Sequence, residues 1–228
     1  ASDVYKRQYI GGWAALLQNI STFILVLALV IGFLVSGIFS DEFQTKADSI
    51  FFSARFGRSR GIFAKVGAGF YITTGFYLMF VFLYTFIVLF VLGADGASCP
   101  IQLDLWRSVY NITFLQAYLF IVLGGYIGTI FAATLAMLAS AFTHSTPTAV
   151  IVPFIVLCVF PFLSRIITLP GLCSFFPDQL LEIYLDIKEA GLITLGSKVT
   201  TIATVIVPVY AVVCLIFQPI LYLSLIHI

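Results

Sequence analysis

Long apolar stretches without charge alternate with short polar stretches along the chain. No Asp, Glu, Lys or Arg occurs in residues 8–40, 66–94 or 199–228, and each run exceeds the ~20 residues that cross a bilayer. The stretch 108–164 also lacks these residue types, and as a single helix it would be ~85 Å long. We therefore expect it to fold back on itself at the polar turn around His144.

The apolar runs predict five membrane-spanning helices. Helices are expected because hydrocarbon offers the backbone no hydrogen-bond partner, and the runs lack the two-residue alternation of a membrane barrel. The expected fold class is all-α, a polytopic helical membrane protein with a single transmembrane domain over residues 9–223. The expected spans cover about 18–39, 66–93, 112–140, 147–166 and 200–223.

The composition agrees with a membrane protein. Charged residues make up 9% of the chain, against about 25% in soluble domains, and hydrophobic residues make up 61%. So few charges cannot cover the surface of a soluble fold. The net charge is +1 and no basic patch lies outside residues 41–65, so we expect no nucleic acid as a partner.

The four cysteines do not form the pattern of a disulfide framework. Cys158 and Cys214 lie inside expected spans, where they fit as small core residues. Cys99 and Cys173 fall in two loops that we expect on the same side of the membrane. A disulfide between them and two free thiols are both open.

Residues 41–65 form a polar island between the first two expected spans. Lysine and arginine gather in cytoplasmic loops, and the island holds five of the eleven in the chain, so it should face the cytoplasm. The loops 95–107 and 165–198, which are less basic, then lie outside. The five basic residues are Lys46, Arg55, Arg58, Arg60 and Lys65.

Apolar residues recur at helical spacing in the first half of the island and form a stripe. The stripe consists of Phe43, Ala47, Ile50, Phe51 and Ala54. A basic turn with Gly57 and Gly61 follows, and the chain enters the next span at Lys65. We expect a short amphipathic helix on the inner membrane surface. It either meets anionic lipid headgroups, as an ordinary loop would, or docks a cytosolic partner.

The second outer loop contains an expected short helix. Asp178 is placed to cap a helix over residues 179–190, which Gly191 would end. One face carries Leu181, Tyr184 and Leu185, which predicts a helix lying along the outer membrane interface. The preceding residues 168–176 are apolar and too short to cross, so they form either a re-entrant dip or a plain loop.

Few residues inside the expected spans carry chemistry. No Asp or Glu lies in a span, which argues against proton-coupled transport and against an intramembrane aspartyl protease. Gly124 and Gly128 form a Gly-x-x-x-Gly spacing that suits packing inside the protein or a seam between two copies. Prolines should kink or loosen the last two spans. They are Pro153, Pro161, Pro208 and Pro219.

The two ends of the sequence differ in character from the rest. Residues 1–8 and 224–228 resemble translated sequencing-adapter strings found at the edges of short-read assemblies. We expect both to be artefacts, and a genuine but unusual terminus is the alternative. The topology also places the start of the chain outside, so we expect an earlier span in an intact protein of six spans.

The order of motifs carries a resemblance to a known family. A long span is followed by Phe-Ser-Asp-Glu-Phe at 39–43, the amphipathic stretch, Ser-Ala-Arg-Phe-Gly-Arg at 53–58 and Ala-Lys at 64–65. This order is similar to that of the type-2 ATP-binding-cassette permeases (ABC-2 family), the membrane subunits of bacterial ABC exporters. In that family the segment forms a coupling helix that docks on the ATPase subunit. The resemblance covers nearly the whole chain, because the downstream loops and spans also fit.

The resemblance implies a docking set within the island. Glu42 matches the acidic start of the coupling segment, Arg55–Arg60 match its basic turn, and Lys65 matches its closing lysine. The chain departs from the family at Ala47-Asp48, where Gly-Thr is usual, and at Gly57, where many members have proline. The implied docking residues are Glu42, Phe43, Ala47, Ile50, Phe51, Ala54, Arg55, Arg58, Arg60 and Lys65.

The resemblance implies a multi-pass permease of the bacterial cytoplasmic membrane. Its partners would be an ABC ATPase subunit that binds ATP and Mg²⁺, a second permease copy or a paralogue, and membrane lipid. The chain has no phosphate-binding Gly-x-x-x-x-Gly-Lys-Ser/Thr loop and only two histidines, so we expect no catalytic, cofactor-binding or metal-binding residues. A non-transporting membrane scaffold or sensor that docks a cytosolic partner through residues 41–65 is the alternative function.

Overall fold

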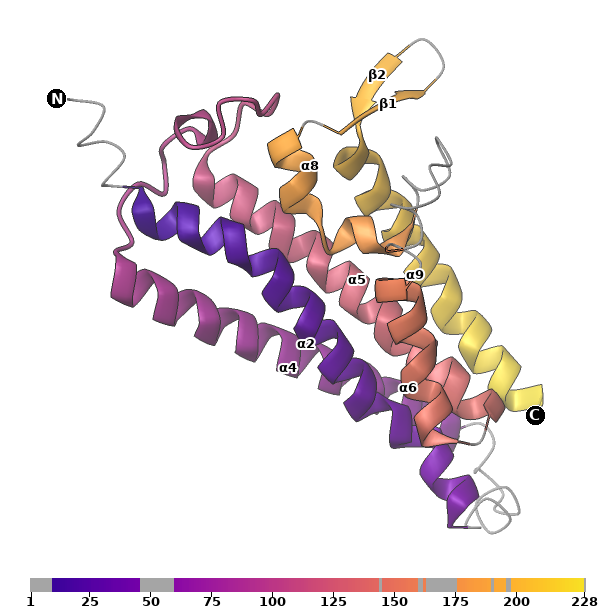
Figure 1. Ribbon diagram of the computed structural model, residues 1–228. Coiled ribbons are helices and arrows are strands. Elements are labelled where there is room, and N and C mark those ends of the chain that lie inside the picture. The colour runs from indigo at the N-terminus through magenta and orange to yellow at the C-terminus, as the bar shows by residue number, and fades with distance from the viewer. Residues whose placement is uncertain are drawn as a thin grey trace, which may run out of the picture.

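The computed structural model describes residues 10–45, 60–143, 145–159, 162, 176–189, 191–195 and 198–227. In order, the helices and strands are α2 (Gly11–Gln44), α4 (Ile62–Leu92), η2 (Ile101–Leu103), α5 (Phe114–Thr143), α6 (Thr146–Phe154), η3 (Ile155–Val159), η5 (Pro177–Leu180), α8 (Ile183–Glu189), β1 (Leu192–Leu195), β2 (Lys198–Thr201) and α9 (Ile202–His227). Long helices dominate, as the sequence predicts (Figure 1).

Four helices are long and apolar enough to cross a membrane, which confirms four of the five expected spans. α2 packs against α4, α5 and α6, and α9 packs mainly on α5 (Figure 1). By the length and composition of these helices, the chain is a multi-pass membrane protein. The four apolar spans cover Gly11–Asp41, Ile62–Leu92, Phe114–Thr143 and Ile202–Ile220.

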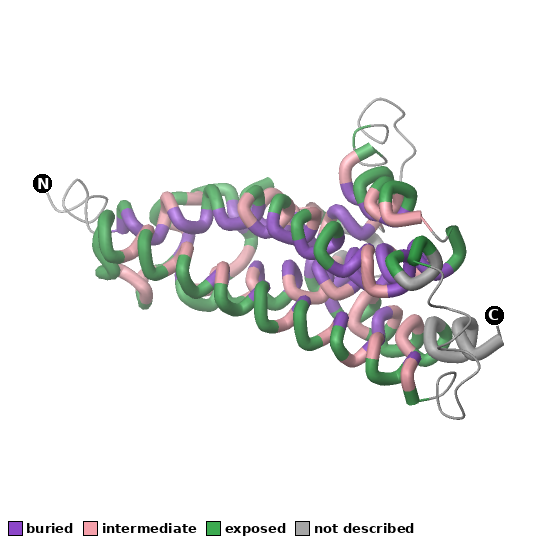
Figure 2. Tube along the Cα trace, turned by 90° about the horizontal axis from the view of Figure 1, so that it is seen from below, coloured by how far each residue is buried: buried purple, intermediate pink, exposed green. Residues whose placement is uncertain are grey.

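The core follows α2 and the side of α5 that faces it. Figure 2 shows buried positions running along the interior of the bundle. Apolar side chains recur on α2 at helical spacing and are almost fully shielded. Those exposed by no more than 1% include Leu16, Leu17, Ile20, Ile24 and Ile31. This burial fixes α2 as the helix around which the others are arranged.

α4 has a different surface from α2. Its buried residues follow a single narrow stripe, whereas Phe82 is 73% exposed and Phe90 is 79% exposed. Large apolar side chains that face outward along a whole helix are suited to contact with lipid or with another apolar surface. The stripe consists of Ile62, Val66, Gly69, Thr73, Tyr77 and Val81.

The fourth expected span, 147–166, is only partly described. α6 begins at Thr146 and changes to the π-helical η3 directly after Phe154. This change follows Pro153, and proline prevents a regular α-helical hydrogen bond, so the predicted loosening is confirmed at this position. The described apolar helix ends at Val159, too short to span, so a fifth span stays a prediction. α9, in contrast, continues through Pro208 and Pro219.

The two ends of the bundle bring together segments that are far apart in sequence. At one end, Trp13 Nε1 donates a hydrogen bond to the Ala94 carbonyl oxygen at 2.8 Å, which joins the start of α2 to the loop after α4. α8 and the β1–β2 hairpin lie at this same end (Figure 1). The end of α2 and the α5–α6 turn lie at the other end. The structure thus separates the inner and outer loops as predicted, and the charge count alone assigns the cytoplasmic side.

The outer segment is not the single helix that the sequence predicts over residues 179–190. The 3-10 helix η5 covers Pro177–Leu180, and α8 begins only at Ile183. Asp178 lies inside η5, and Phe176 occupies the N-cap position, so the predicted cap at Asp178 is wrong. Proline is favoured in the first turn because its fixed φ and missing N–H fit there, and Pro177 therefore starts the helix earlier.

The apolar face of this segment packs on the bundle, and its position along the outer membrane interface stays a prediction. Leu181 is 1% exposed and Tyr184 is 8% exposed, because α8 and η5 pack against α5, α9 and each other. The apolar face that was expected to meet lipid is covered by the protein. Contact with the bundle removes this face from water without inserting charged neighbours into the membrane.

A β-hairpin connects the outer segment to the last span. β1 and β2 pair antiparallel, from Leu192 opposite Thr201 to Leu195 opposite Lys198. Residues 200 and 201, expected at the start of the last span, therefore belong to a strand, and α9 begins at Ile202. Thr200 and Thr201 are β-branched, which suits a strand better than a helix end.

Gly124 and Gly128 of α5 contact other segments of the same chain. Their Gly-x-x-x-Gly spacing therefore serves packing inside the protein, one of the two interpretations given above. A Cβ atom placed on Gly128 would lie 2.9 Å from Leu181 Cδ2, and one on Gly124 would overlap the Ile183 side chain. Leu181 follows η5 directly and Ile183 begins α8. Their close approach to α5 requires residues without a side chain at positions 124 and 128. The glycines thus set how closely the outer segment approaches α5.

Replacing Gly128 by valine should destabilise the protein, because Leu181 and Leu180 already fill the space beside it. Overpacking of this kind costs about 1–3 kcal/mol. Gly75→Val is the matched control, since nothing lies within 4 Å of a Cβ at Gly75. Thermal unfolding of the purified variants in detergent checks the prediction. Equal unfolding temperatures for the two variants would contradict it.

Candidate functional site

The structure describes part of the predicted coupling element. Glu42 and Phe43 lie in the last turn of α2, and for these two residues only the backbone is described. Arg60 lies just before α4, and Lys65 lies in the first turn of that helix. The remaining predicted docking residues, Ala47, Ile50, Phe51, Ala54, Arg55 and Arg58, are outside the described ranges, as are His144 and the segment 168–175.

α2 does not end at the acidic residues that open the island. The helix continues through Asp41 to Gln44, and Thr45 Oγ1 donates a hydrogen bond to the Asp41 carbonyl oxygen at 2.7 Å. The expected end of the first span near residue 39 lies close to the end of the apolar span at Asp41, and α2 itself continues to Gln44. The first residues of the island form one rigid body with the central helix of the bundle.

Lys65 joins the two sides of the island. Its Nζ lies 5.3 Å from the centroid of the Phe39 ring, so a cation–π contact connects α4 to α2. The side chain is half-buried, and its charge is held at the end of the apolar spans. The residue that the family resemblance assigns to the close of the coupling segment therefore contacts the helix from which that segment emerges.

Thr146 lies at the centre of a hydrogen-bond network at the inner end. Its Oγ1 is 2.7 Å from Ser40 Oγ, accepts a hydrogen bond from Gln44 Nε2 at 3.0 Å, and donates to Asp41 Oδ1 at 3.4 Å. Thr146 is the first residue of α6, and the other three residues belong to α2. The network therefore connects the root of the island to the α5–α6 turn.

Two serines extend this network toward the core. Ser140 Oγ on α5 donates a hydrogen bond to the Ser36 carbonyl oxygen and accepts one from the Ser40 backbone N–H at 2.9 Å. All three serines are buried. We call Ser36, Ser40, Asp41, Gln44, Ser140 and Thr146 the inner cluster. A pair of serines four residues apart in an apolar helix, as at 36 and 40, is the sequence signal that could have indicated it.

The inner cluster joins the end of α2 to α5 and α6 through hydrogen bonds. It holds three helices at one point, so a force on the chain after Gln44 reaches α5 and α6 through hydrogen bonds. The described residues contain no group of three or more His, Cys, Asp or Glu that could hold a metal ion. The chemistry at this end is therefore hydrogen bonding between neutral groups, with Asp41 at its edge.

A second polar group lies at the outer end and was not found from the sequence. Asp178 is only 3% exposed and Asp186 only 8%. Asp178 Oδ2 accepts a hydrogen bond from Gln179 Nε2 at 3.0 Å, whereas Asp178 Oδ1 and Asp186 Oδ2 are buried without a hydrogen-bond partner. Asp178, Glu182 and Asp186 follow each other at four-residue spacing, which is the signal that could have indicated a shared face.

Burial changes the acidity of these two carboxyl groups. Burial, followed by the charge of Glu182, raises the pKa of Asp186 to about 7. Burial also raises the pKa of Asp178 to about 6, and the hydrogen bond from Gln179 opposes part of this increase. Both groups therefore hold their protons at a pH where an exposed aspartate is ionised.

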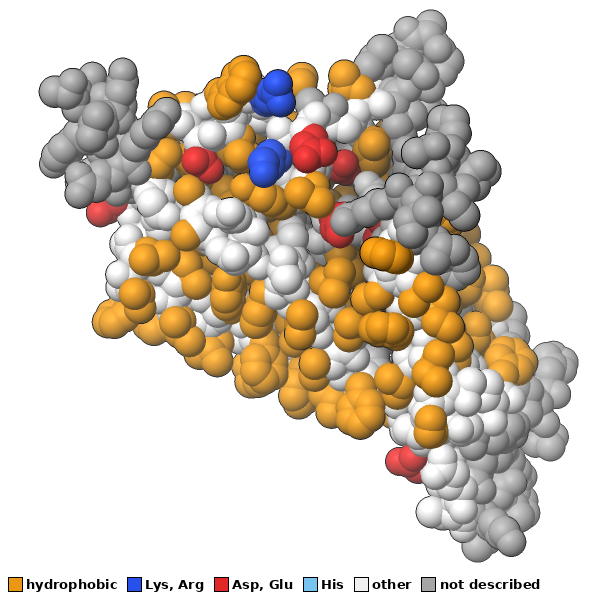
Figure 3. Space-filling model, in the orientation of Figure 1, with side chains coloured by type: hydrophobic (Ala, Val, Ile, Leu, Met, Phe, Trp, Pro, Cys, Tyr) orange, Lys and Arg blue, Asp and Glu red, His pale blue; other side chains and the backbone are white. Residues whose placement is uncertain are grey.

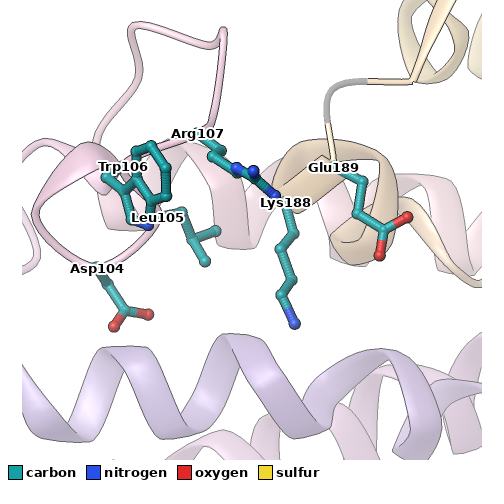
Figure 4. A pocket seen from close by; sticks show the side chains of 6 residues that line it. All are labelled: Asp104, Leu105, Trp106, Arg107, Lys188 and Glu189. Carbon is teal, nitrogen blue, oxygen red and sulfur yellow. The ribbon is translucent and has the colours of Figure 1, made fainter.

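A cleft of about 630 Å³ opens at the outer end of α8 (Figure 4). Charged side chains on the displayed face gather near this end of the molecule, above an apolar belt (Figure 3). Trp106 is 78% exposed and stacks with Arg107, whose guanidinium carbon is 5.0 Å from the ring centroid. Exposed charges of both signs are typical of a solvated surface. The lining residues are Asp104, Leu105, Trp106, Arg107, Lys188 and Glu189.

Cys99 has a free thiol and is half-buried. Cys173, the other cysteine of the suggested pair, is outside the described ranges. Cys158 and Cys214 are also free, and Cys214 is buried against α5, where its thiol lies 3.8 Å from the Ile127 carbonyl oxygen. Small apolar packing thus accounts for Cys214, as expected from the sequence.

Comparisons with known proteins add no family. A scan against protein-family models matched none, and searches of curated proteins and of solved structures found no similar chain. The function must therefore be argued from the motifs and from the geometry described above.

Thr146→Val should weaken the inner end, because it keeps the size of the side chain and removes the hydroxyl that joins α6 to α2. Hydrogen bonds between membrane helices contribute on the order of 1 kcal/mol. Thr134→Val is the matched control, since the buried Thr134 hydroxyl bonds only its own helix at the Ile130 carbonyl oxygen. Thermal unfolding in detergent should show the larger loss for Thr146→Val, and the reverse order would contradict the role of the cluster.

Proposed function

We propose that the chain is the transmembrane permease subunit of an ATP-binding-cassette export system. In this proposal, residues 41–65 dock on a separate ATPase subunit in the cytoplasm. ATP and Mg²⁺ bind to that subunit, and a second permease copy or a paralogue completes the transporter. The bacterial cytoplasmic membrane is the proposed location.

The observation that supports this proposal is the inner cluster. Its Thr146 hydroxyl joins the α5–α6 turn to Gln44, the residue from which the island continues. Because α2 is one helix of 34 residues, displacement of its inner end also moves the buried face that packs on α4, α5 and α6. A coupling element needs such a connection, since docking energy must reach the spans to change their packing.

The position of Lys65 supports the proposal independently. Its contact with Phe39 brings both ends of the island to one place at the membrane surface. A force on the segment between these ends can therefore reach both α2 and α4. The basic residues between these ends would give a docking surface for an acidic region of the ATPase, with affinity that decreases at high ionic strength.

Co-purification of this chain with a co-expressed ABC ATPase subunit tests the proposal. In an island variant, Phe43, Ala47, Ile50, Phe51 and Ala54 become serine, and Arg55, Arg58 and Arg60 become glutamine. We expect the amount of bound ATPase to fall at least about tenfold, because the variant loses both the apolar and the charged contacts of the docking surface. ATPase binding that survives these changes would show that the coupling assignment is wrong.

The control removes the same kind of charge from the opposite end. Arg107→Gln and Lys188→Gln alter exposed residues of the outer cleft and should leave ATPase binding unchanged. ATP hydrolysis by the reconstituted complex then separates two functions. Hydrolysis that responds to the permease supports transport, whereas a stable complex without any response supports the alternative scaffold or sensor.

A further inference from the structure

η5 and α8, which we call the outer helix pair, dock on the bundle through a close apolar contact. Leu180, Leu181 and Ile183 are each at most 1% exposed. They occupy the surface that Gly124 and Gly128 leave open on α5. This contact is well packed, so it explains why the pair lies on the bundle.

The same docked position buries two carboxyl groups that the packing does not need. Asp178 and Asp186 are both more than nine-tenths buried, and each has one oxygen without a hydrogen-bond partner. The Tyr110 hydroxyl is also buried without a partner, so it does not supply the missing donor. An ionised carboxylate in such a place has lost its hydration, and too few hydrogen bonds replace it.

The groups that face these carboxyls are acidic or neutral. Glu189 acts on Asp186 from its own helix, and Glu182 acts on it from the position just before that helix. Asp178 of η5 and Tyr110 of the loop before α5 also act on Asp186. Tyr210 of α9 faces Asp178, and α5 contributes the surface around Gly124 and Gly128. No Lys or Arg of the described residues offsets the charge of Asp186.

We propose that the outer helix pair is a proton-dependent element, which stays docked while Asp178 and Asp186 are protonated and is released when they ionise. A protonated carboxyl is neutral and can donate one hydrogen bond, so it tolerates the buried position. Ionisation places two like charges, with Glu182 nearby, in a site where no Lys or Arg of the described residues offsets them. This inference goes beyond the proposed transport function and does not depend on it.

The direction of the pH dependence follows from the raised pKa values of Asp178 and Asp186. A carboxyl whose pKa is higher in the docked state than in water favours docking at low pH. The contribution is complete below the ordinary aspartate value of about 4. It is lost as the pH rises through about 6 for Asp178 and about 7 for Asp186. Docking should therefore weaken as the pH rises from about 4 to about 7, and it should be weaker at pH 8 than at pH 5.5.

Hydrogen exchange of the protein in lipid nanodiscs tests this proposal. Protection factors of α8 amides, corrected for the intrinsic effect of pH on exchange, should fall at least about tenfold between pH 5.5 and pH 8. Each group can contribute up to about tenfold per pH unit between its ordinary pKa of about 4 and its higher docked pKa. Peptides from the middle of α5 report on the bundle itself and should keep their protection.

Asp178→Asn with Asp186→Asn provides the decisive comparison. Asparagine imitates the neutral carboxyl, so the double variant should keep its α8 protection at pH 8. Asp95→Asn, a change at an exposed residue of the loop after α4, should retain the pH dependence of the original protein. Protection that falls equally in the double variant and the original protein would overturn the proposal, as would protection in the original protein that does not change with pH.

Thermal unfolding and added calcium provide two further tests of the proposal. At pH 8, Asp186→Asn should unfold at a temperature no lower than that of the original protein, and a lower temperature would contradict the proposal. Calcium chloride at pH 8 should not restore α8 protection in the original protein. Restoration by calcium would identify a bound cation, instead of protons, as the neutralising agent and would overturn the proposal.

Discussion

Hydrocarbon offers no hydrogen-bond partner to a polar group, and this constraint shapes both the middle and the ends of the bundle. In the middle, buried threonines bond back to their own helices, as Thr73 does to the Gly69 carbonyl oxygen and Thr129 to the Gly125 carbonyl oxygen. Tyr77 Oη donates to the Val122 carbonyl oxygen at 2.6 Å, a contact between α4 and α5. Packing therefore holds most of the middle together, and polar networks concentrate near the ends.

The two polar groups at the ends differ because their side chains differ in hydrogen-bonding capacity. A hydroxyl both donates and accepts, so Ser40, Ser140 and Thr146 can satisfy one another without a charge. A carboxylate only accepts, so Asp178 and Asp186 cannot satisfy each other while ionised. The inner cluster is thus a permanent connection, whereas the outer helix pair depends on the protonation of its carboxyls. This difference suits an inner end that transmits force and an outer end that responds to conditions.

Much of the fold could be predicted from the sequence. Charge-free runs of sufficient length predict spans, because the cost of placing a charge in lipid is large, and four of these spans are present in the structure. Pro153 correctly indicated a loosened helix, since its effect is local. The cap at Asp178 was wrong because Pro177, one position earlier, competes for the start of the same helix. The hairpin was missed because its strands have only four residues each, too few for a clear alternation.

The sequence by itself determined the apolar helices, their approximate limits and the separation of the loops onto two sides, since these depend on local composition and on the thickness of a membrane. Tertiary structure decided which polar groups meet. Ser40 and Thr146 are 106 positions apart, and no local pattern relates them. The outer carboxyls are likewise ordinary polar residues of a loop until η5 and α8 pack on α5. Side-chain burial depends on which helix faces come together, and that choice belongs to the whole bundle.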